Sequence, residues 1–449
     1  MDKSVTLSDD AQNKVFKSKV VVDAVATETA MDKIIASVDT TGKCQTINSD
    51  GTVNVTSAEA TDGYVCSATD AYGTSYYYRG NVTNNYVKFA DKYWRIIRIN
   101  GDGTVRVIYD GTSAHANGES SEDRQIGKSK FNEYWKKDNV QETTNSKVLY
   151  DNAGVGYMYG NRDTIVEATE YDSTINFTNT STYYIAKEYN YDVATDRFTL
   201  KDPIAVLGSA MTSDYVGYYT FGETDASYSS SYELKKIFGV TAGDSWADVE
   251  CGCVRYGTSS KEVAQTNTND STIKTYLDNW YKTNISGTEN EQYLADNIFC
   301  NDRSFSSSNS GTGAGVSITY YNRYNWQGSK SNLKCPQQND AFTVSDTSKG
   351  NGALTYPIGL ITTDEAVLAG GWWANNNSYY LYSGSYYWAL SPADFSGQSL
   401  VHSVSYFGFA SDINTTDSLA VVRPVLNLSP EVLNNGDGTM NNPYKLSVQ

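Results

Sequence analysis

Apolar residues recur at roughly helical spacing near the start of the chain, between Asp10 and Val38. A spacing of three to four residues places such side chains on one face of a helix. The pattern predicts an N-terminal helix within residues 1–40, which either packs at the edge of the domain or acts as a stalk. The apolar positions are Val15, Val20, Val21, Val22, Val25, Ala26, Met31, Ile34, Ile35 and Val38, and Thr40-Thr41-Gly42 ends the run.

The pattern changes to alternation between residues 86 and 109. Apolar and cationic side chains alternate along Tyr93–Ile99 and again along Thr104–Tyr109, and Asn100-Gly101-Asp102-Gly103 separates the two runs. Alternation on both sides of such a turn predicts a β-hairpin, preceded by a strand at Tyr86–Phe89. Asp102 is interpreted as a turn residue, because the other carboxylates of a calcium loop are missing from the required offsets.

Two later segments return to the helical period. Ser271 can cap a helix whose apolar face is formed by Ile273, Leu277, Trp280 and Tyr281. Residues 360–371 predict a strand end, a threonine N-cap and a short helix that a glycine ends. The adjacent Asp364 and Glu365 lie in its first turn, where negative charge opposes the helix dipole favourably.

The middle of the chain, about residues 115–350, is polar, and its pattern is irregular apart from short helical stretches. We interpret it as a large insertion into one α+β domain that spans residues 41–449. No phosphate-binding loop, nucleophile elbow or zinc helix occurs in its sequence. The expected organisation is therefore an N-terminal helix or stalk at 1–40, followed by a single domain with an insertion.

Composition and charge exclude several classes of function. Only 19% of the residues are charged, 13% are aromatic and the formal net charge is −17. Such a charge opposes binding to nucleic acid or anionic membranes, and the aromatic content is too high for a disordered chain. The chain has two histidines, and we expect His115 to be a surface residue. A histidine-based active site or zinc site is not expected, so the protein is predicted not to be an enzyme and to need no cofactor.

Six cysteines in a chain rich in Ser, Thr, Asn and Tyr suggest an oxidising compartment and disulfide bonds. Fifteen pairings are possible, and the sequence-local ones are Cys44–Cys66 and Cys300–Cys335. Cys251 and Cys253 are too close in sequence for an unstrained bond. The sequence contains neither a secretory apolar segment nor a membrane span. We interpret its start, Met1-Asp2-Lys3, as following a removed leader or anchor, and we expect an extracellular or cell-surface protein.

Residues 372–415 have the composition of a protein-binding surface. Aromatic, hydroxyl and amide side chains are dense there, and Lys and Glu are nearly absent. Tyr and Trp supply contact area with few torsions to freeze, and Ser and Asn supply adaptable hydrogen bonds. The candidate ligand-binding residues are Trp372, Trp373, Asn375, Asn377, Tyr379, Tyr380, Tyr386, Asp394, Phe395, Ser405, Tyr406, Phe407, Phe409 and Asp412.

An ordered series of short motifs runs along the chain. It comprises Tyr93-Trp94-Arg95-Ile96-Ile97, the helix at 273–281, Ile361-Thr362-Thr363-Asp364-Glu365, Tyr387-Trp388-Ala389-Leu390-Ser391-Pro392 and Val422-Arg423-Pro424-Val425-Leu426. This series resembles bacterial exported proteins of the C-type-lectin-like fold. That group includes the variable proteins of diversity-generating retroelements and relatives of the formylglycine-generating enzyme. The resemblance covers about residues 86–428.

The resemblance implies a surface-exposed adhesin or receptor-like protein whose binding face is residues 372–415. In the retroelement variable proteins, the corresponding face is diversified. It also implies that the first strand and the Val422–Leu426 strand lie near one another. Its partner would be a protein or glycan on another cell or a host surface. Lectin-type calcium ligand triplets are missing, and Cys251 and Cys253 lie away from the oxidase positions of the enzyme relatives. Two alternatives remain, a calcium-independent carbohydrate-binding module and a pilus or surface-layer subunit.

Overall fold

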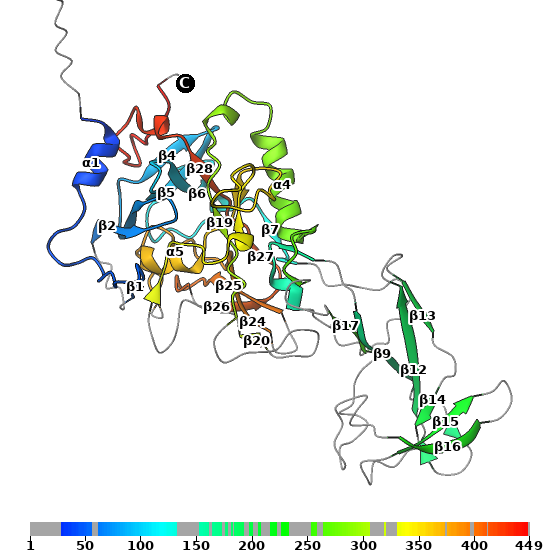
Figure 1. The fold of residues 1–449 in the computed structure, drawn as a ribbon. Coiled ribbons are helices and arrows are strands. Elements are labelled where there is room, and N and C mark those ends of the chain that lie inside the picture. Colours follow the sequence, from blue (N-terminus) through cyan, green and yellow to red (C-terminus); the bar gives the residue numbers. More distant parts are fainter. Residues whose placement is uncertain are drawn as a thin grey trace, which may run out of the picture.

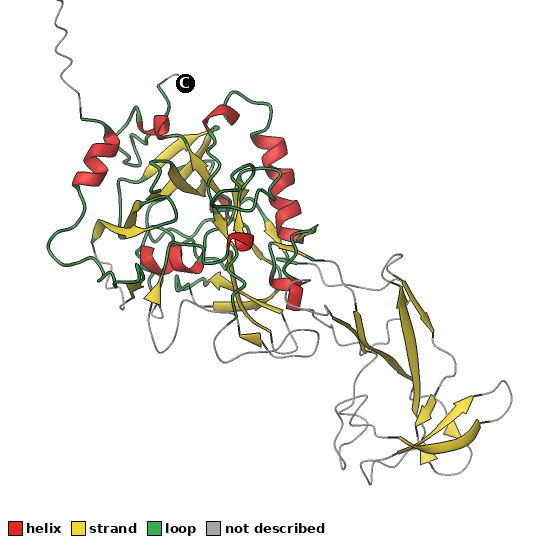
Figure 2. Ribbon diagram, viewed as in Figure 1, coloured by secondary structure: helices red, strands yellow, loops and turns green. Residues whose placement is uncertain are grey.

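The computed structural model shows a mixed α+β protein in which sheets predominate (Figures 1 and 2). It describes residues 28–55, 62–132, 152–160, 264–305, 330–372, 375–395, 399–410 and 412–447. For the strands between residues 164 and 257, for 318–319, and for Phe395, Asp412 and Ile413 it describes the backbone only. The α-helices in these parts are α1 (Ala30–Ala36), α4 (Thr272–Asn284) and α5 (Thr363–Ala369).

The first large sheet is antiparallel and contains both strands of the predicted hairpin. Its strand order is β2 (Gly63–Thr69), β3 (Thr74–Gly80), β5 (Lys92–Ile99), β6 (Val105–Gly111), β28 (Val425–Leu428) and β23 (Ile358–Gly359), and β4 (Tyr86–Phe89) pairs with β5. The pairing of β28 with β6 places Val425 opposite Ile108. A segment near the end of the chain therefore completes a sheet that begins near its start.

The second sheet contains the strands that lie within the predicted binding face, residues 372–415. Its strand order is β26 (Asp412–Thr415), β25 (Ser399–Val404), β24 (Tyr387–Phe395), β27 (Ala420–Val421) and β7 (Lys128–Ser129), and β20 (Ile318–Thr319) pairs with β24. The register of β24 shifts on both sides of Pro392. Proline has no N–H to donate to a ladder, so an irregular register is expected there.

The middle of the chain is more regular than its composition predicts. Strands from this region form an antiparallel sheet in the order β16 (Ala226–Tyr232), β15 (Val216–Phe221), β14 (Ala205–Leu207), β12 (Tyr184–Asp192), β9 (Thr164–Asp172) and β17 (Cys253–Gly257), and β13 (Arg197–Leu200) pairs with β12. Two-stranded pairs are β1 (Val53–Asn54) with β21 (Lys330–Ser331), β8 (Met158–Tyr159) with β18 (Asn269–Asp270), β10 (Asn176–Phe177) with β11 (Ser181–Thr182), and β19 (Phe299–Cys300) with β22 (Ala341–Phe342).

The predicted limits of the insertion, 115 and 350, also differ from the structure. Residues that precede and follow the third sheet in the sequence belong to the main hydrophobic core. They include Phe131, Tyr157, Leu277 and Phe342. Phe131 packs edge-on against Trp388, with ring centroids 5.6 Å apart. Short apolar segments separated by polar loops carry little periodic signal, and only their tertiary partners show that they are core.

Among the described residues, the 3₁₀ turns are η2 (Glu122–Arg124), η3 (Asn152–Val155), η4 (Glu291–Tyr293), η5 (Gln338–Asp340) and η6 (Pro430–Leu433).

The local predictions for the helices agree with the structure where it describes them. α1 covers part of the predicted N-terminal helix, and residues 1–27 lie outside the described residues. Ser271 caps α4 by accepting from the Lys274 N–H. Thr362 and Glu365 form a capping box at α5, and Gly370 ends that helix with φ +127°. Capping side chains satisfy N–H groups that have no partner within the helix, which is why the sequence signal is reliable.

Glu365 has a second role that its helix position did not indicate. It is buried, and Arg98 Nε and Arg106 Nε lie 3.0 and 2.6 Å from its Oε1. Asp70 adds a second carboxylate, 2.7 Å from Arg98 Nη1. Two arginines of the hairpin therefore join α5 to the first sheet through a buried cluster with balanced charge.

Two disulfides connect the residues predicted from sequence proximity. Cys44 is bonded to Cys66, and Cys300 is bonded to Cys335, with a Cα–Cα distance of 5.5 Å in each pair. Cys253 lies in β17, and Cys251 lies outside the described residues. Within the part of the chain that the structure describes, no helix has both the length and the apolar character needed to cross a membrane.

Candidate functional site

A tight turn at residues 405–409 projects from the end of β25. The Ser405 N–H donates to the Phe409 carbonyl at 2.8 Å, and the Gly408 N–H donates to the Ser405 carbonyl at 2.9 Å. Ser405 Oγ accepts from the Phe407 N–H at 3.1 Å. Gly408 has φ +88°, a conformation that a residue with a side chain adopts only at a cost. These bonds fix the turn, so the two residues at its tip cannot fold back into the core.

Four aromatic side chains at and beside this turn form what we call the aromatic ridge: Tyr386, Tyr406, Phe407 and Phe409. Ring centroids lie 4.9 Å apart for Tyr386 and Tyr406, 3.9 Å for Tyr406 and Phe407, and 6.4 Å for Phe407 and Phe409. Among the described residues, five large hydrophobic side chains are exposed, and Tyr386, Tyr406 and Phe407 are three of them, at 36, 41 and 42%. Adjacent exposed aromatics of this kind mark interaction sites.

The ridge is held from behind by the segment that follows α5. The Asn376 N–H donates to the Phe407 carbonyl at 3.0 Å, and the Ala410 N–H donates to the Gly371 carbonyl at 2.7 Å. The side-chain amide of buried Asn376 donates to the Gly370 carbonyl at 3.1 Å. A Cβ placed on Gly408 would collide with the Asn376 carbonyl. The turn is thus positioned by backbone contacts that only glycine permits.

The structure divides the predicted ligand-binding residues into exposed and buried groups. Asn375, Asn377, Tyr386, Tyr406 and Phe407 are exposed, and Trp372, Asp394 and Phe409 are half-buried. Trp373 lies outside the described residues, and Phe395 and Asp412 are described by their backbone alone.

Tyr379, Tyr380 and Ser405 are corrections to the predicted face, because all three are buried. Tyr380 donates its hydroxyl to the Tyr78 carbonyl at 3.3 Å, and the Arg95 guanidinium lies 5.5 Å from its ring centroid. Burial raises the pKa of Tyr380 well above its ordinary value, so the hydroxyl remains a donor. Composition alone predicted contact with ligand, but Tyr380 connects the segment to the first sheet.

Three charged residues below this segment were not predicted as part of the site. Asp110, Arg124 and Arg423 are buried, and Asp110 Oδ1 lies 2.7 Å from Arg124 Nη2 and 3.1 Å from Arg423 Nη2. Burial lowers the pKa of Arg423, although Tyr387 and Asp110 oppose that effect. The sequence signal was limited to Arg423, a charged residue in an otherwise apolar segment, which indicates a buried partner without identifying it.

His115 is a further correction, since it was expected at the surface and is 5% exposed. Its ring nitrogens lie 2.8 Å from Glu119 Oε1 and 3.0 Å from Asp123 Oδ2. The hydrogen bond from His115 lowers the pKa of Glu119. Burial opposes ionisation of Asp123, but hydrogen bonds from His115 and Thr112 outweigh it and lower its pKa. The loop 112–124 is therefore folded around the buried His115 side chain.

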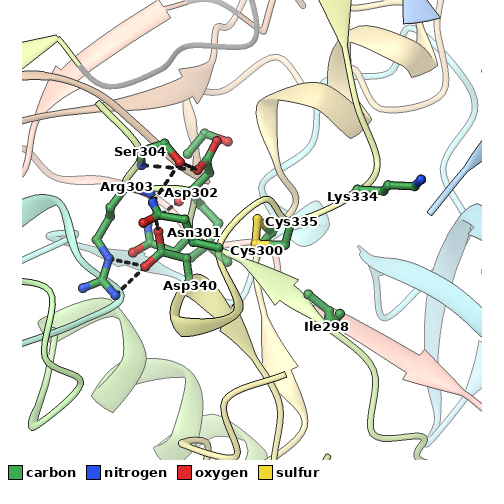
Figure 3. Close-up of a disulfide and its surroundings, with 12 residues drawn as sticks. Ile298, Cys300, Asn301, Asp302, Arg303, Ser304, Lys334, Cys335 and Asp340 are labelled. Atoms are coloured by element: carbon green, nitrogen blue, oxygen red, sulfur yellow. Dashed lines mark hydrogen bonds and ion pairs between the residues drawn. A yellow bond between two sulfur atoms is a disulfide. The ribbon is translucent and has the colours of Figure 1, made fainter. Parts of the chain in front are cut away.

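A polar pocket of about 30 Å³ lies beside the Cys300–Cys335 disulfide and is lined by Arg98, Arg106 and Glu365 among other residues. That volume holds roughly one or two water molecules. Figure 3 shows the disulfide with Arg303 and Asp340 facing each other on one side and Lys334 directed away on the other. The described residues contain no group of three or more His, Cys, Asp or Glu placed to hold a metal ion. Four of the charged residues that line this pocket, Asp70, Arg98, Arg106 and Glu365, pair with one another, so we assign these four to the framework.

Comparison with known proteins identified no relative: no family model matches the chain, and neither the curated proteins nor the solved structures gave a match. The structure thus defines an α+β protein with two disulfides and an exposed aromatic ridge on a rigid turn. Its function has to be argued from that surface.

Proposed function

We propose that this protein is a surface-exposed ligand-binding protein, an adhesin or receptor-like molecule, that presents the aromatic ridge on a C-type-lectin-like scaffold. The observation that carries the proposal is the contiguous exposure of Tyr386, Tyr406 and Phe407 in a chain whose other tyrosines near the site are buried. A residue that is exposed and held rigidly loses little entropy on binding.

Two features of the scaffold support the proposal. β28 pairs with β6 and lies in the same sheet as the earlier strands β4 and β5, which supports the proximity that the C-type-lectin-like resemblance implies for the first strand and the Val422–Leu426 segment. The two disulfides agree with an oxidising location such as the cell exterior. The net charge of −17 disfavours nucleic acid as the partner.

The energy of binding would come from few residues. At protein interfaces a buried aromatic anchor contributes up to a few kcal/mol, about 2 or more at a hot spot, and polar neighbours exclude water around it. Phe407 and Tyr406 at the tip are placed for such a role, with exposed Asn375 and Asn377 on the adjoining segment. The partner would be a protein on another cell or a host surface.

A glycan ligand is the second candidate, and one observation favours it. The rings of Phe407 and Phe409 lie within 16° of parallel, so together they offer sugar rings two similarly oriented faces. The ring of Tyr406 is tilted by 40° from Phe407, which breaks that platform on its other side. The two candidates therefore differ in which pair of rings must be intact.

The test is a parallel screen of the full chain against a glycan array and an array of cell-surface proteins. The variants are Phe407→Ala, Tyr406→Ala and Phe409→Ala, and Ile47→Ala is the matched control because Ile47 is 43% exposed but lies outside the ridge. We expect Phe407→Ala to weaken binding to any captured protein by about 30-fold or more, the equivalent of roughly 2 kcal/mol.

The pattern of losses identifies the ligand class. Loss with Phe407→Ala and Tyr406→Ala supports the protein ligand, whereas loss with Phe407→Ala and Phe409→Ala on the glycan array supports the carbohydrate-binding alternative. Binding that all ridge variants retain contradicts the proposal. Concentration-dependent assembly of the unmodified chain, measured by light scattering, would instead support a pilus or surface-layer subunit.

A further inference from the structure

The segment between α5 and β24 has neither helix nor strand between residues 375 and 386. Its carbonyl groups therefore lack the partners that a sheet or helix would supply, and buried carbonyls need donors. The Tyr380 N–H donates to the Gly80 carbonyl at 3.2 Å, and the Tyr382 N–H donates to the Tyr379 carbonyl at 3.1 Å. The carbonyls of Tyr380 and Leu381 accept hydrogen bonds from side chains instead.

Two buried arginines satisfy those carbonyls. Arg124 Nη2 donates to the Tyr380 carbonyl at 3.1 Å, and Arg423 Nη1 donates to the Leu381 carbonyl at 2.8 Å. Each guanidinium also donates to Asp110 Oδ1, from Arg124 Nε at 2.8 Å and from Arg423 Nη2 at 3.1 Å. Both side chains are completely buried, so water cannot replace these donors without opening the core.

Arg423 also contacts β6 and the first residue of β24. Arg423 Nε donates to the Tyr109 carbonyl at 3.1 Å, and its guanidinium lies 4.9 Å from the Tyr387 ring centroid. Tyr387 follows the ridge residue Tyr386 and donates its hydroxyl to the Leu381 carbonyl at 3.1 Å. At the other end of the segment, Asn376 holds the Phe407 carbonyl.

We propose that Asp110, Arg124 and Arg423 are positioning residues that fix residues 379–382 and thereby set the orientation of the aromatic ridge. Each guanidinium has five N–H donors and uses only some of them on the shared Asp110 carboxylate, which leaves donors for the carbonyls of Tyr380 and Leu381. The consequence for binding rests on the proposed function of the ridge. The ordering of residues 379–382 does not, and it can be measured without a ligand.

The experiment is amide hydrogen exchange on the full chain, read by mass spectrometry for residues 375–386 and for β5 and β6. Arg124→Met is the informative variant, because it leaves Asp110 and Arg423 as a charge-balanced pair. The matched control is Arg303→Met: Arg303 is also buried, lies 2.6 Å from Asp340 Oδ1 and donates to the Met158 carbonyl, away from the ridge.

We expect Arg124→Met to accelerate exchange of the Tyr380 and Tyr382 amides by about tenfold or more, as local opening becomes easier, with β5 and β6 unchanged. Arg303→Met should accelerate exchange near Met158 and leave 375–386 as in the wild type. Wild-type protection of 375–386 in Arg124→Met overturns the proposal, and so does an equal acceleration everywhere, which would indicate a general stabilising role.

If Arg124→Met does not fold, Arg124→Lys decides. Lysine keeps the charge but lacks the planar fork that reaches carboxylate and carbonyl together. Acceleration confined to 375–386 supports positioning, and uniform or absent acceleration contradicts it. Failure of the ridge itself would appear differently, as ridge variants that bind like the wild type while the exchange pattern is as expected.

Discussion

Two pairs of adjacent aromatic residues in the predicted binding face have opposite fates. Tyr379 and Tyr380 are completely buried, whereas Tyr406 and Phe407 are each more than 40% exposed. The first pair lies on a segment that packs against the first sheet, and the second lies at the tip of a turn. Segments of similar composition are therefore buried in one place and exposed in the other, and the backbone around each pair decides which.

The difference follows from what each backbone can satisfy. The Tyr380 N–H has a partner in Gly80, and its carbonyl has a partner in Arg124, so the chain there can enter the core. At the turn, Ser405 and Phe409 bond to each other across the tip. The turn is closed by hydrogen bonds between its own residues, and the side chains at its tip lie at the surface.

The largest expected effect separates the two pairs by stability. Tyr380→Ala removes a fully buried ring and should lower the free energy of unfolding by about 3–5 kcal/mol. Phe407→Ala removes an exposed ring and should change it by less than about 0.5 kcal/mol. Urea unfolding followed by tryptophan fluorescence measures both. Equal losses for the two variants would mean that the contrast in burial is not real in solution.

A smaller effect is expected at the glycine that closes the turn. Gly408→Ala places a Cβ against the Asn376 carbonyl at φ +88° and should cost about 1–3 kcal/mol. Gly103→Ala is the control, because Gly103 has a similar φ of +85° with nothing within 4 Å of a Cβ, and it should cost about 1 kcal/mol.

The difference between the two glycine variants in thermal or urea unfolding isolates the contact with Asn376. If Gly408→Ala and Gly103→Ala destabilise the protein equally, the turn is not held by that contact. A larger loss for Gly408→Ala, accompanied by faster amide exchange at residues 405–410, would sharpen the assignment of the ridge as a rigid element.

The smallest expected effect is a pH dependence confined to the buried framework. Burial would raise the pKa of Glu365, but Arg106 and Arg98 outweigh burial and hold it below the ordinary value of 4.5. The ionised carboxylate therefore stabilises the fold at and above that value, and its contribution is lost as the pH falls below it.

Unfolding free energies measured between pH 6 and pH 3 should decline less steeply in Glu365→Gln than in the wild type, by up to about 1.4 kcal/mol per pH unit. Glu291→Gln is the control, because Glu291 lies on a 3₁₀ turn that has no buried residue. Identical slopes for the wild type and Glu365→Gln would show that Glu365 is not ionised in the framework as its two arginine partners require.

The sequence predicted local elements well and their surroundings less well. The hairpin over residues 93–109, the caps at Ser271 and Thr362 and the pairs Cys44–Cys66 and Cys300–Cys335 agree with the structure. Each depends on residues close in sequence, so a short pattern contains the whole cause. Tyr406 and Phe407 were predicted as ligand-binding residues from composition, and both side chains are exposed.

The partners of the buried polar side chains could not be predicted from the sequence, because those partners can lie far away along the chain. Asp110 and Arg423 are 313 residues apart, yet their atoms are within hydrogen-bond distance. His115 similarly has the sequence context of a surface loop, and only the folding of residues 112–124 around it explains its burial. An arginine or histidine next to polar residues looks the same in sequence whether its partner is water or a distant carboxylate.

What the sequence by itself determined was therefore the type of each local element, which is set by backbone propensity, capping and hydrophobic period acting over a few residues. It also indicated the sequence-local disulfide pairs among fifteen possible pairings, and the composition of the predicted binding face. The tertiary structure alone decided which aromatics are presented and which are core, because burial depends on whether distant donors satisfy the backbone that carries them. Arg124 and Arg423 supply those donors to Tyr380 and Leu381, whereas the turn at 405–409 closes on itself through Ser405 and Phe409 and receives one bond from the Asn376 backbone.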